Sequence, residues 1–399
     1  MTPERAVIVG ASHAGAQLAA NLRREGWSGE VVLIGDEGGL PYHRPPLSKG
    51  YLAGKNGLDD LLIRGADFYE KQHIRLLNAT VEAIHRSAKR VSLSTGDTLT
   101  YTKLALCTGA RARRLPTPGV DLPGIHYLRT AADVELIRAA ATPGRRVVIV
   151  GGGYIGLETA ASLCSLGMNV TVLEATERVL ERVTAPEVSA FYTRIHRGEG
   201  VEIRTHALVE AFSGNGGVQE VVLADGESIP ADLVIVGVGV VPNTELASAA
   251  GLSVDNGIVI DDQARTSDPD IGAAGDCRSH TMARYGSRIR LESVSSAGEQ
   301  AKIAAATICG KHSAIAALPW FWSDQYDLKL QIAGLNAGYD ELLLSGDPSR
   351  DRDFSCFYFR EGELIAADCV NRPRDFMSSK RAISQQLRVD RSELLAGSI

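Results

Sequence analysis

The sequence predicts an α/β fold with two Rossmann-like domains, each built around a parallel sheet. One glycine-rich turn occupies residues 10–15, and a second occupies residues 151–156 far downstream. Each turn follows an apolar run and opens a stretch rich in Ala and Leu, which is the strand-turn-helix pattern of a dinucleotide site. An acid follows at the end of the next apolar run, Asp36 in the first copy and Glu174 in the second. The chain is therefore expected to bind two dinucleotides.

The first copy reads as a strand over 6–9, a helix over about 14–25 and a strand over 31–34. Gly10 and Gly15 let the turn tighten, so that backbone N–H groups at the helix start can stabilise a pyrophosphate. Asp36 stands where a carboxylate can hold ribose hydroxyls. Ser12 replaces the middle glycine, and its hydroxyl is expected to donate a hydrogen bond there instead.

The second copy has the full glycine pattern, Gly151, Gly153 and Gly156, between a strand ending at 150 and a helix reaching Leu166. Glu174 ends the following strand. Its carboxylate suits a 2′-hydroxyl and would repel a 2′-phosphate, which favours NADH over NADPH. Arg178 offers a way to accommodate such a phosphate. The alternative is an ordinary exposed arginine at a helix start.

Composition excludes several functional classes. The 399 residues are enough for two or three domains, and the net charge of −6 argues against a general nucleic-acid binder. No apolar run approaches the ~20 residues of a membrane span. The segment 1–5 leads directly into the first strand, without the apolar region of a targeting peptide. We expect a cytoplasmic protein.

The six cysteines contain no Cys-x-x-Cys pair and no regular metal-ligand spacing. They are read as structural thiols in a reducing compartment. The histidines also lack ligand spacing, so no metal site is expected. The first cysteine is Cys107, which leaves the whole first strand-turn-helix copy without a thiol.

Three further apolar segments are interleaved with the glycine turns, at 105–110, 234–239 and 271–276. Singly they would be ordinary buried strands. The last one can place Asp276 at a helix start, where its carboxylate would take hydroxyls of the ribityl chain of a flavin cofactor.

Four longer motifs make the pattern specific: residues 40–49 (LPYHRPPLSK), 178–183 (RVLERV), 266–269 (TSDP) and 319–326 (PWFWSDQY). With them the chain resembles, over nearly its whole length, the NADH-dependent ferredoxin reductases of bacterial oxygenase systems. These form a branch of the two-dinucleotide-binding flavoprotein family that includes glutathione reductase.

The resemblance implies an FAD domain made of 1–111 and 247–318, an NADH domain over 112–246, and a C-terminal α+β domain over 319–399. FAD contacts are implied at Gly10, Ser12, Ala14, Gly15, Asp36, Lys49, Val81, Arg129, Asp276 and Val294. NADH contacts are implied at Gly151, Gly153, Tyr154, Ile155, Gly156, Glu158, Glu174 and Gly239. Tyr154 is expected to shield the flavin until nicotinamide enters.

The implied reaction is hydride transfer from NADH to FAD, followed by single-electron transfer to a 2Fe-2S ferredoxin that supplies a haem-thiolate monooxygenase or a ring-hydroxylating dioxygenase. Disulfide reductases of the family carry redox-active cysteines in the region that here spans 42–51 and has none. Lys49 and Glu158 are expected to form a polar pair beside flavin N5. The alternative is a structural salt bridge.

Trp322, with Trp320, is assigned to the electron exit, although large aromatic residues are more often core. Lys302, Lys380 and Arg381 could attract an acidic ferredoxin, or be plain solvated surface. Two other functions stay open: an interaction protein similar to apoptosis-inducing factor, and the flavin subunit of a nitrite reductase. The chain has no basic cluster for the first and no fused siroheme or iron-sulfur module for the second.

Overall fold

The computed structural model describes residues 4–396, and its contacts divide the chain into two compact units. The first unit holds residues up to 43, 59–111 and 241–319; the second holds 44–58, 112–240 and the chain from 320 onward. Two short ranges lie outside the described part, residues 1–3 and residues 397–399. The first begins the segment that is expected to lack a targeting peptide, and the second ends the expected C-terminal domain. The three-domain division remains a prediction.

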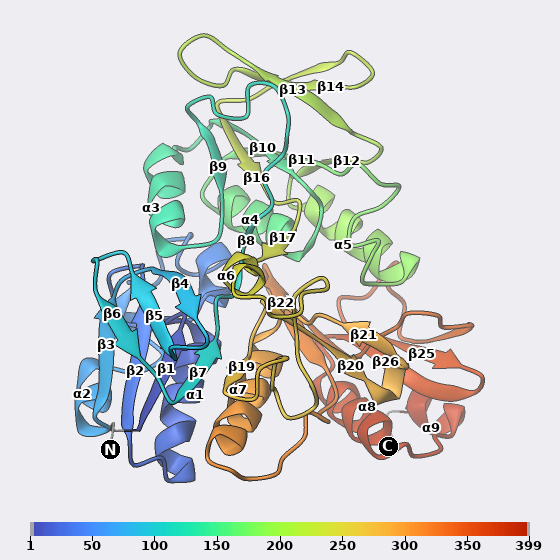
Figure 1. Ribbon diagram of the computed structural model, residues 1–399. Coiled ribbons are helices and arrows are strands. Elements are labelled where there is room, and N and C mark those ends of the chain that lie inside the picture. Colours follow the sequence, from blue (N-terminus) through green and yellow to red (C-terminus); the bar gives the residue numbers. More distant parts are fainter. Residues whose placement is uncertain (1–3, 397–399) are drawn as a thin grey trace. The chain divides into compact units, whose positions relative to one another are not determined.

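The first unit is built on a five-stranded sheet in the order β19-β7-β1-β2-β3, with every pair parallel (Figure 1). Helices α1 and α7 contact each other beside it. The elements are β1 (Arg5–Val9), α1 (His13–Glu25), β2 (Glu30–Gly35), β3 (Ile74–Asn78), β7 (Lys103–Leu106), β19 (Ile271–Ala273) and α7 (Val294–Ile308). The sheet order reverses beside β1, so the glycine turn after β1 lies at the switch point where such sheets bind ligands.

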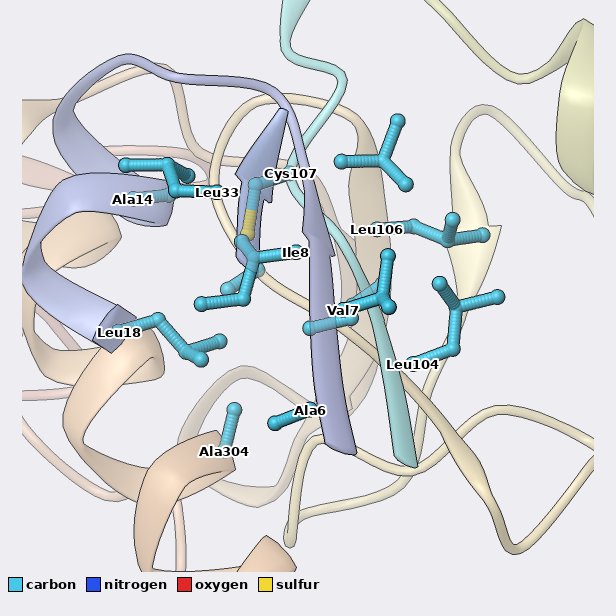
Figure 2. Close-up of a cluster of buried hydrophobic side chains, with 14 of the residues drawn as sticks. Ala6, Val7, Ile8, Ala14, Leu18, Leu33, Leu104, Leu106, Cys107 and Ala304 are labelled. Atoms are coloured by element: carbon cyan, nitrogen blue, oxygen red, sulfur yellow. The ribbon is translucent and has the colours of Figure 1, made fainter. Parts of the chain in front are cut away.

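The core of the first unit explains why these segments fold as they do. Residues 6–9 of β1 are all buried, as expected for a parallel strand covered on both faces. Figure 2 shows Ile8 on the side of α1 and α7, near Leu18, and Val7 on the opposite side with Leu104. On α1, Ala14, Leu18 and Leu22 recur at four-residue spacing and are buried.

The remaining elements of the first unit are short. They are α2 (Ala66–Lys71), α6 (Glu245–Ala249), two 3₁₀ turns, η2 (Asp59–Leu61) and η3 (Ala283–Tyr285), an antiparallel sheet of β4 (Val81–His85), β5 (Arg90–Leu93) and β6 (Thr98–Thr100), and a sheet of β18 (Ile258–Val259), β20 (Arg278–Met282) and β21 (Ser287–Ile289). Asp276 stands in the turn between β19 and β20. The expectation that it begins a helix is therefore wrong. Because the β20–β21 hairpin intervenes, the next helix, α7, begins only at Val294.

The second unit contains a parallel sheet in the order β12-β11-β10-β16-β9. Its elements are β9 (Ile125–Tyr127), α3 (Ala131–Ala140), β10 (Arg146–Val150), α4 (Tyr154–Ser165), β11 (Asn169–Leu173), α5 (Pro186–Gly198), β12 (Glu202–Arg204) and β16 (Leu233–Val236). An antiparallel sheet of β13 (Val209–Ser213), β14 (Glu220–Leu223) and β15 (Ser228–Pro230) is inserted before β16. Two short strands, β8 (Ala110–Ala112) and β17 (Val240–Pro242), occur where the chain passes from one unit to the other.

The second unit also contains an antiparallel sheet in the order β22-β23-β26-β25-β24, drawn in orange to red in Figure 1. Its strands are β22 (Trp320–Gln325), β23 (Leu328–Gly334), β24 (Glu341–Ser345), β25 (Phe354–Arg360) and β26 (Glu363–Val370); α8 (Pro373–Gln385) packs on β23 and β26, and α9 (Arg391–Ala396) follows. The turn η1 (Pro45–Ser48) and strand β22 both contact α4. The predicted fold class, two Rossmann-like sheets with a C-terminal α+β domain, is confirmed.

Candidate functional site

The first glycine turn is closed too tightly for side chains. Gly10 has φ +109°, and a Cβ there would stand 2.1 Å from the carbonyl oxygen of Cys107. A Cβ on Gly15 would stand 1.9 Å from the carbonyl oxygen of Gly10. Ser12 is the N-cap of α1 and has extended backbone angles. Glycine is thus required at both ends of the turn, and the backbone runs directly into the N-terminus of α1.

Two other predicted residues gather around this turn. Asp36 follows β2 and is exposed; since β1 and β2 are parallel neighbours, it lies at the same sheet edge as Gly10. The Asp276 turn also lies close, because a Cβ on Gly275 would come within 3.0 Å of the Ala14 side chain. The structure therefore brings Ala14, Asp36 and Asp276 to the carboxyl edge of one parallel sheet.

A histidine pair that the sequence did not suggest stands at the same turn. His13, the first residue of α1, places Nε2 2.9 Å from Nδ1 of His43, in the 40–49 motif. Burial, and secondarily the charge of Arg64, lowers the pKa of His43. A neutral ring in one of the two residues can donate to the other, so the pair links the glycine turn to that motif.

The second glycine turn repeats this construction. Gly151 has φ +110°, and its Cβ would stand 2.5 Å from the carbonyl oxygen of Gly237. A Cβ on Gly156 would come within 2.1 Å of the Gly151 oxygen. The space around Gly153, the N-cap of α4, is open to 4 Å among the described residues. The backbone at this helix N-terminus is accordingly accessible to a ligand.

Glu174 is fixed against the second turn. Its Oε2 accepts the Gly152 N–H over 2.7 Å, and its Oε1 accepts the Thr176 N–H over 2.9 Å. The carboxylate is half-buried at the end of β11. Arg178 is also half-buried, well before α5 begins at Pro186, so the expectation of an exposed helix start is wrong. Its guanidinium donates to the carbonyls of 181 and 184 and to the Ser189 hydroxyl.

Lys49 and Glu158 form the ion pair that the sequence suggested. Lys49 Nζ lies 2.7 Å from Glu158 Oε2, and the Glu158 side chain is only 4% exposed. The Ser48 hydroxyl donates to the same oxygen over 2.5 Å, and the Ser323 hydroxyl donates to Oε1 over 2.6 Å. Lys49 Nζ also donates to the Pro45 carbonyl over 3.0 Å. An ammonium has three donors, and the described residues take two of them.

Trp322 does not join this pair. In β22, Phe321 and Ser323 face α4, where Phe321 packs on the Tyr154 ring at 4.8 Å between centroids. Because side chains alternate along a strand, Trp320 and Trp322 share the other face, with ring centroids 5.7 Å apart. Trp322 therefore lies one residue from the ion-pair network, on the opposite side of its strand.

The expected docking residues fall into two groups. Lys302 is exposed on α7 of the first unit. Lys380 and Arg381 lie on α8 of the second, where Lys380 Nζ stands 4.6 Å from the Trp320 ring centre and burial lowers the pKa of Lys380. Met377 is 61% exposed on the same helix. Positions 377, 380 and 381 share one face of α8, because residues three and four apart are neighbours on a helix.

The other predicted contacts are scattered through the two units. Val81 begins β4 and is buried, Val294 begins α7, Arg129 precedes α3, and Ile155 is exposed in the first turn of α4. Gly239 is exposed beyond β16, with φ +96°. No contact shown here tests these five as ligands, and they remain predictions.

Both helix N-termini fit a pyrophosphate. The first turns, residues 13–16 of α1 and 154–157 of α4, contain no carboxylate that would repel an anion. Each turn leads from a parallel strand at a sheet switch point, and an acid stands at the end of the neighbouring strand. The described residues thus fit one dinucleotide in each unit. Within residues 4–396, no helix is both long and apolar enough to cross a membrane.

Comparison with known families agrees with this geometry. Residues 4–301 match the sequence profile of the pyridine nucleotide-disulphide oxidoreductases, and residues 320–398 match that of a reductase C-terminal domain. The chain belongs to the pyridine nucleotide-disulphide oxidoreductase family. The family name refers to a disulfide, but the segment 42–51 of this chain contains no cysteine, and the first cysteine is Cys107.

Individual relatives within the oxidoreductase family are close. The chain is 47% identical to a putidaredoxin reductase of Pseudomonas putida over 97% of this chain and 93% of that protein. It is 45% identical to a ferredoxin–NAD(P)(+) reductase of a Sphingomonas species over 96% and 94%. Its structure matches the reductase in a covalent putidaredoxin reductase–putidaredoxin complex with a TM-score of 0.95, 45% identity and 99% coverage of both chains.

Proposed function

We propose that this protein is an FAD-dependent NADH:ferredoxin oxidoreductase whose partner is a small 2Fe-2S ferredoxin serving an oxygenase. The observation that carries the proposal is the Lys49 ammonium, held on the buried Glu158 carboxylate in a segment that has no thiol. In relatives with disulfide chemistry that segment carries cysteines. Here it presents a positive charge with one N–H beyond those that Glu158 and Pro45 accept.

FAD, when bound, accepts a hydride from NADH and passes electrons on one at a time. The chain's own residues bind and orient the two nucleotides. The N-terminus of α1 would hold the FAD pyrophosphate, and the Asp36 and Asp276 carboxylates would accept hydrogen bonds from hydroxyl groups of its ribose and ribityl chain. The N-terminus of α4 takes NADH, with Glu174 on the adenosine ribose. Lys49 would supply an N–H donor and a positive charge to a bound ligand.

The partner docks, in this proposal, on the exposed face of α8. Met377 supplies apolar contact area, and Lys380 and Arg381 supply positive charge complementary to an acidic ferredoxin. Trp320 lies beneath this helix, because Lys380 covers its ring, and Trp322 is the neighbour of Trp320 on the same face of β22. Trp322 is thereby proposed to line the electron exit and not the hydride site. The six free thiols fit a reducing compartment, so we place the reaction in the cytoplasm.

The test is NADH-driven reduction of a panel of purified 2Fe-2S ferredoxins, followed by bleaching of the cluster absorbance under anaerobic conditions. The protein is first analysed for flavin, and we expect one FAD per chain, released by denaturation. Rapid catalytic bleaching of at least one ferredoxin is expected. A flavin-free protein that gains no FAD on refolding, or an FAD-loaded protein that reduces no ferredoxin, would contradict the proposal.

A further inference from the structure

The outer side of helix α5 carries a hollow that the proposed function does not use. Its volume is about 400 Å³, which falls in the range of small-molecule sites. Every lining residue belongs to the second unit, and six of them give the hollow its shape and charge: Glu177, Arg178, Ala190, Thr193, Arg194 and Arg197. We call it the α5 hollow.

The α5 hollow follows from the two faces of its helix. Phe191 and Ile195 face the interior of the second unit and are at most 4% exposed. The opposite face carries, at spacings of three and four residues, Ala190, Thr193, Arg194 and Arg197. Ala190 has only a methyl group, so it leaves room between the longer side chains. The loop at residues 177–178 forms a further wall.

The charge that lines the α5 hollow is unbalanced. The lining contains the guanidiniums of Arg178, Arg194 and Arg197 but only one carboxylate, Glu177, in a chain whose net charge is −6. Within residues 4–396, none of the three arginines forms an ion pair with a carboxylate. The α5 hollow therefore keeps a local positive potential that attracts anions.

Two of the guanidiniums are held in place and still have donors to offer. Arg194 Nη2 donates to the carbonyls of residues 348 and 351 over 2.9 and 3.0 Å, and its guanidinium lies 5.3 Å from the Phe191 ring centre. Arg197 Nη2 donates to a carbonyl of β12 over 3.0 Å. A guanidinium has five N–H donors, so the described residues leave three on Arg194 and four on Arg197. Both groups are thus positioned before a ligand arrives, which lowers the entropy cost of binding.

We propose that the α5 hollow binds a small organic phosphate, with Arg194 and Arg197 holding the phosphate group and the Thr193 hydroxyl supplying a further hydrogen bond. A guanidinium presents a planar fork that matches phosphate oxygens. The site is additional to the nucleotide site of the second unit, because neither Glu174 nor the turn at 151–156 lines the hollow. The inference does not depend on the proposed function.

The concave shape of the site favours a small molecule over an acidic protein. A stable protein interface covers about 800 Å² on each partner. The guanidiniums without an ion pair are instead gathered around one hollow. A small anion can contact several of them at once.

The experiment is isothermal titration calorimetry of the purified protein with inorganic pyrophosphate as the probe. Excess FAD and NAD⁺ are present, so that nucleotide sites are occupied, and the ionic strength is low because salt screens exposed charges. We expect one pyrophosphate per chain.

Two arginine variants test which residues hold the probe. Arg194→Gln and Arg197→Gln each remove a charge-assisted hydrogen-bond donor, and each should weaken pyrophosphate binding about tenfold. Arg374→Gln is the matched control, because Arg374 is an exposed arginine on α8 of the same unit and does not line the hollow. Its affinity for pyrophosphate should equal that of the wild type.

A further pair of variants leaves every arginine in place. Ala190 is exposed, so its replacement does not disturb the core. Ala190→Glu sets a carboxylate inside the hollow, four residues before Arg194, where it can form an ion pair along the helix. It should weaken pyrophosphate binding by more than about 30-fold, whereas the uncharged Ala190→Gln should weaken it much less. This pair decides the matter if Arg194→Gln does not fold.

Three outcomes would overturn the inference: no pyrophosphate binding in the presence of NAD⁺; unchanged affinity in Ala190→Glu or in both arginine variants; and an equal loss in Arg374→Gln. A higher KM for ferredoxin in Ala190→Glu, with no pyrophosphate binding to the wild type, would show that the hollow contacts a protein instead. A protein that binds pyrophosphate at the α5 hollow but reduces no ferredoxin would contradict the proposed function and leave this inference standing.

Discussion

Replacing Glu174 by glutamine should reduce the preference for NADH over NADPH. The carboxylate is half-buried at the end of β11, with Oε2 on the Gly152 N–H. A 2′-phosphate carries about −1.5 to −2 charges at pH 7. Two unit charges ~4 Å apart repel by about 1 kcal/mol in water and about 4 kcal/mol at an effective dielectric of 20. For the half-exposed Glu174 carboxylate and a phosphate about 5 Å away, the repulsion weakens NADPH binding by about 2 kcal/mol, or about 30-fold in affinity.

Glu174→Gln keeps the size of the side chain and an oxygen for the Gly152 N–H but removes the charge. We expect NADPH affinity to rise about 30-fold while NADH affinity falls less than about threefold. The assay is the rate of flavin bleaching in a stopped-flow instrument as a function of NADH and NADPH concentration. Glu177→Gln is the matched control, since Glu177 is an exposed carboxylate on the same loop.

The result that would refute the reasoning is a Glu174→Gln variant that discriminates as strongly as the wild type. An equal change of the NADH preference in Glu177→Gln would show instead that the net charge of the loop, and not Glu174 itself, selects the nucleotide. Arg178 should not compensate, because its guanidinium already donates to two carbonyls and to a serine.

Three further predictions concern docking and stability. Arg381→Glu on α8 should raise the KM for ferredoxin several-fold and make that KM less dependent on salt, while turnover with ferricyanide stays unchanged. The control is Arg350→Glu, which should not change the KM for ferredoxin, because the Arg350 side chain is 85% exposed in a loop of the same sheet. Burial lowers the pKa of His196 to about 4, so the folded state resists protonation of this ring, and the protein should lose up to about 3 kcal/mol of folding stability as the pH falls from about 6.5 to 4. Calorimetry should show that the unfolding temperature of His196→Gln falls less over this pH range than that of the wild type. Burial raises the pKa of Asp368 to about 7, so the folded state favours the protonated carboxyl group, and the wild-type protein should become less stable as the pH rises from about 4 to 7. Asp368→Asn can still accept a hydrogen bond from Tyr358 and should be about 2 to 4 kcal/mol more stable than the wild type above pH 7. An unchanged unfolding temperature of this variant at pH 8 would contradict the prediction.

The parts of the fold that could be predicted are those that local sequence dictates. Runs such as residues 6–9 and 147–150 are apolar throughout, which identifies buried parallel strands, and a glycine turn followed by an Ala-rich segment identifies the helix after each. The error at Asp276 arose because nothing local distinguishes a turn into a helix from a turn into the β20–β21 hairpin. Strand β20 is mostly buried, and it pairs with β18, which lies well before it in the sequence.

The candidate site was predictable only in part for the same reason. Lys49 and Glu158 were suggested by resemblance, because no spacing rule relates residues 109 positions apart. Ser323 and Gln325 lie in a motif that the sequence singled out, and their two-residue spacing places them on one strand face. Their partners could not be derived, since His196 and Glu158 reach that face only through long-range packing of helices on β22.

The most direct test of the central claim, that electrons leave through a protein carrier and not through a thiol, is NADH oxidation before and after exhaustive alkylation with iodoacetamide. The FAD-loaded protein would be assayed in parallel with a 2Fe-2S ferredoxin and with oxidised glutathione as acceptors. We predict rapid ferredoxin reduction that alkylation leaves nearly unchanged, and no comparable rate with the disulfide. Disulfide reduction that alkylation abolishes, with no response to any ferredoxin, would contradict the account.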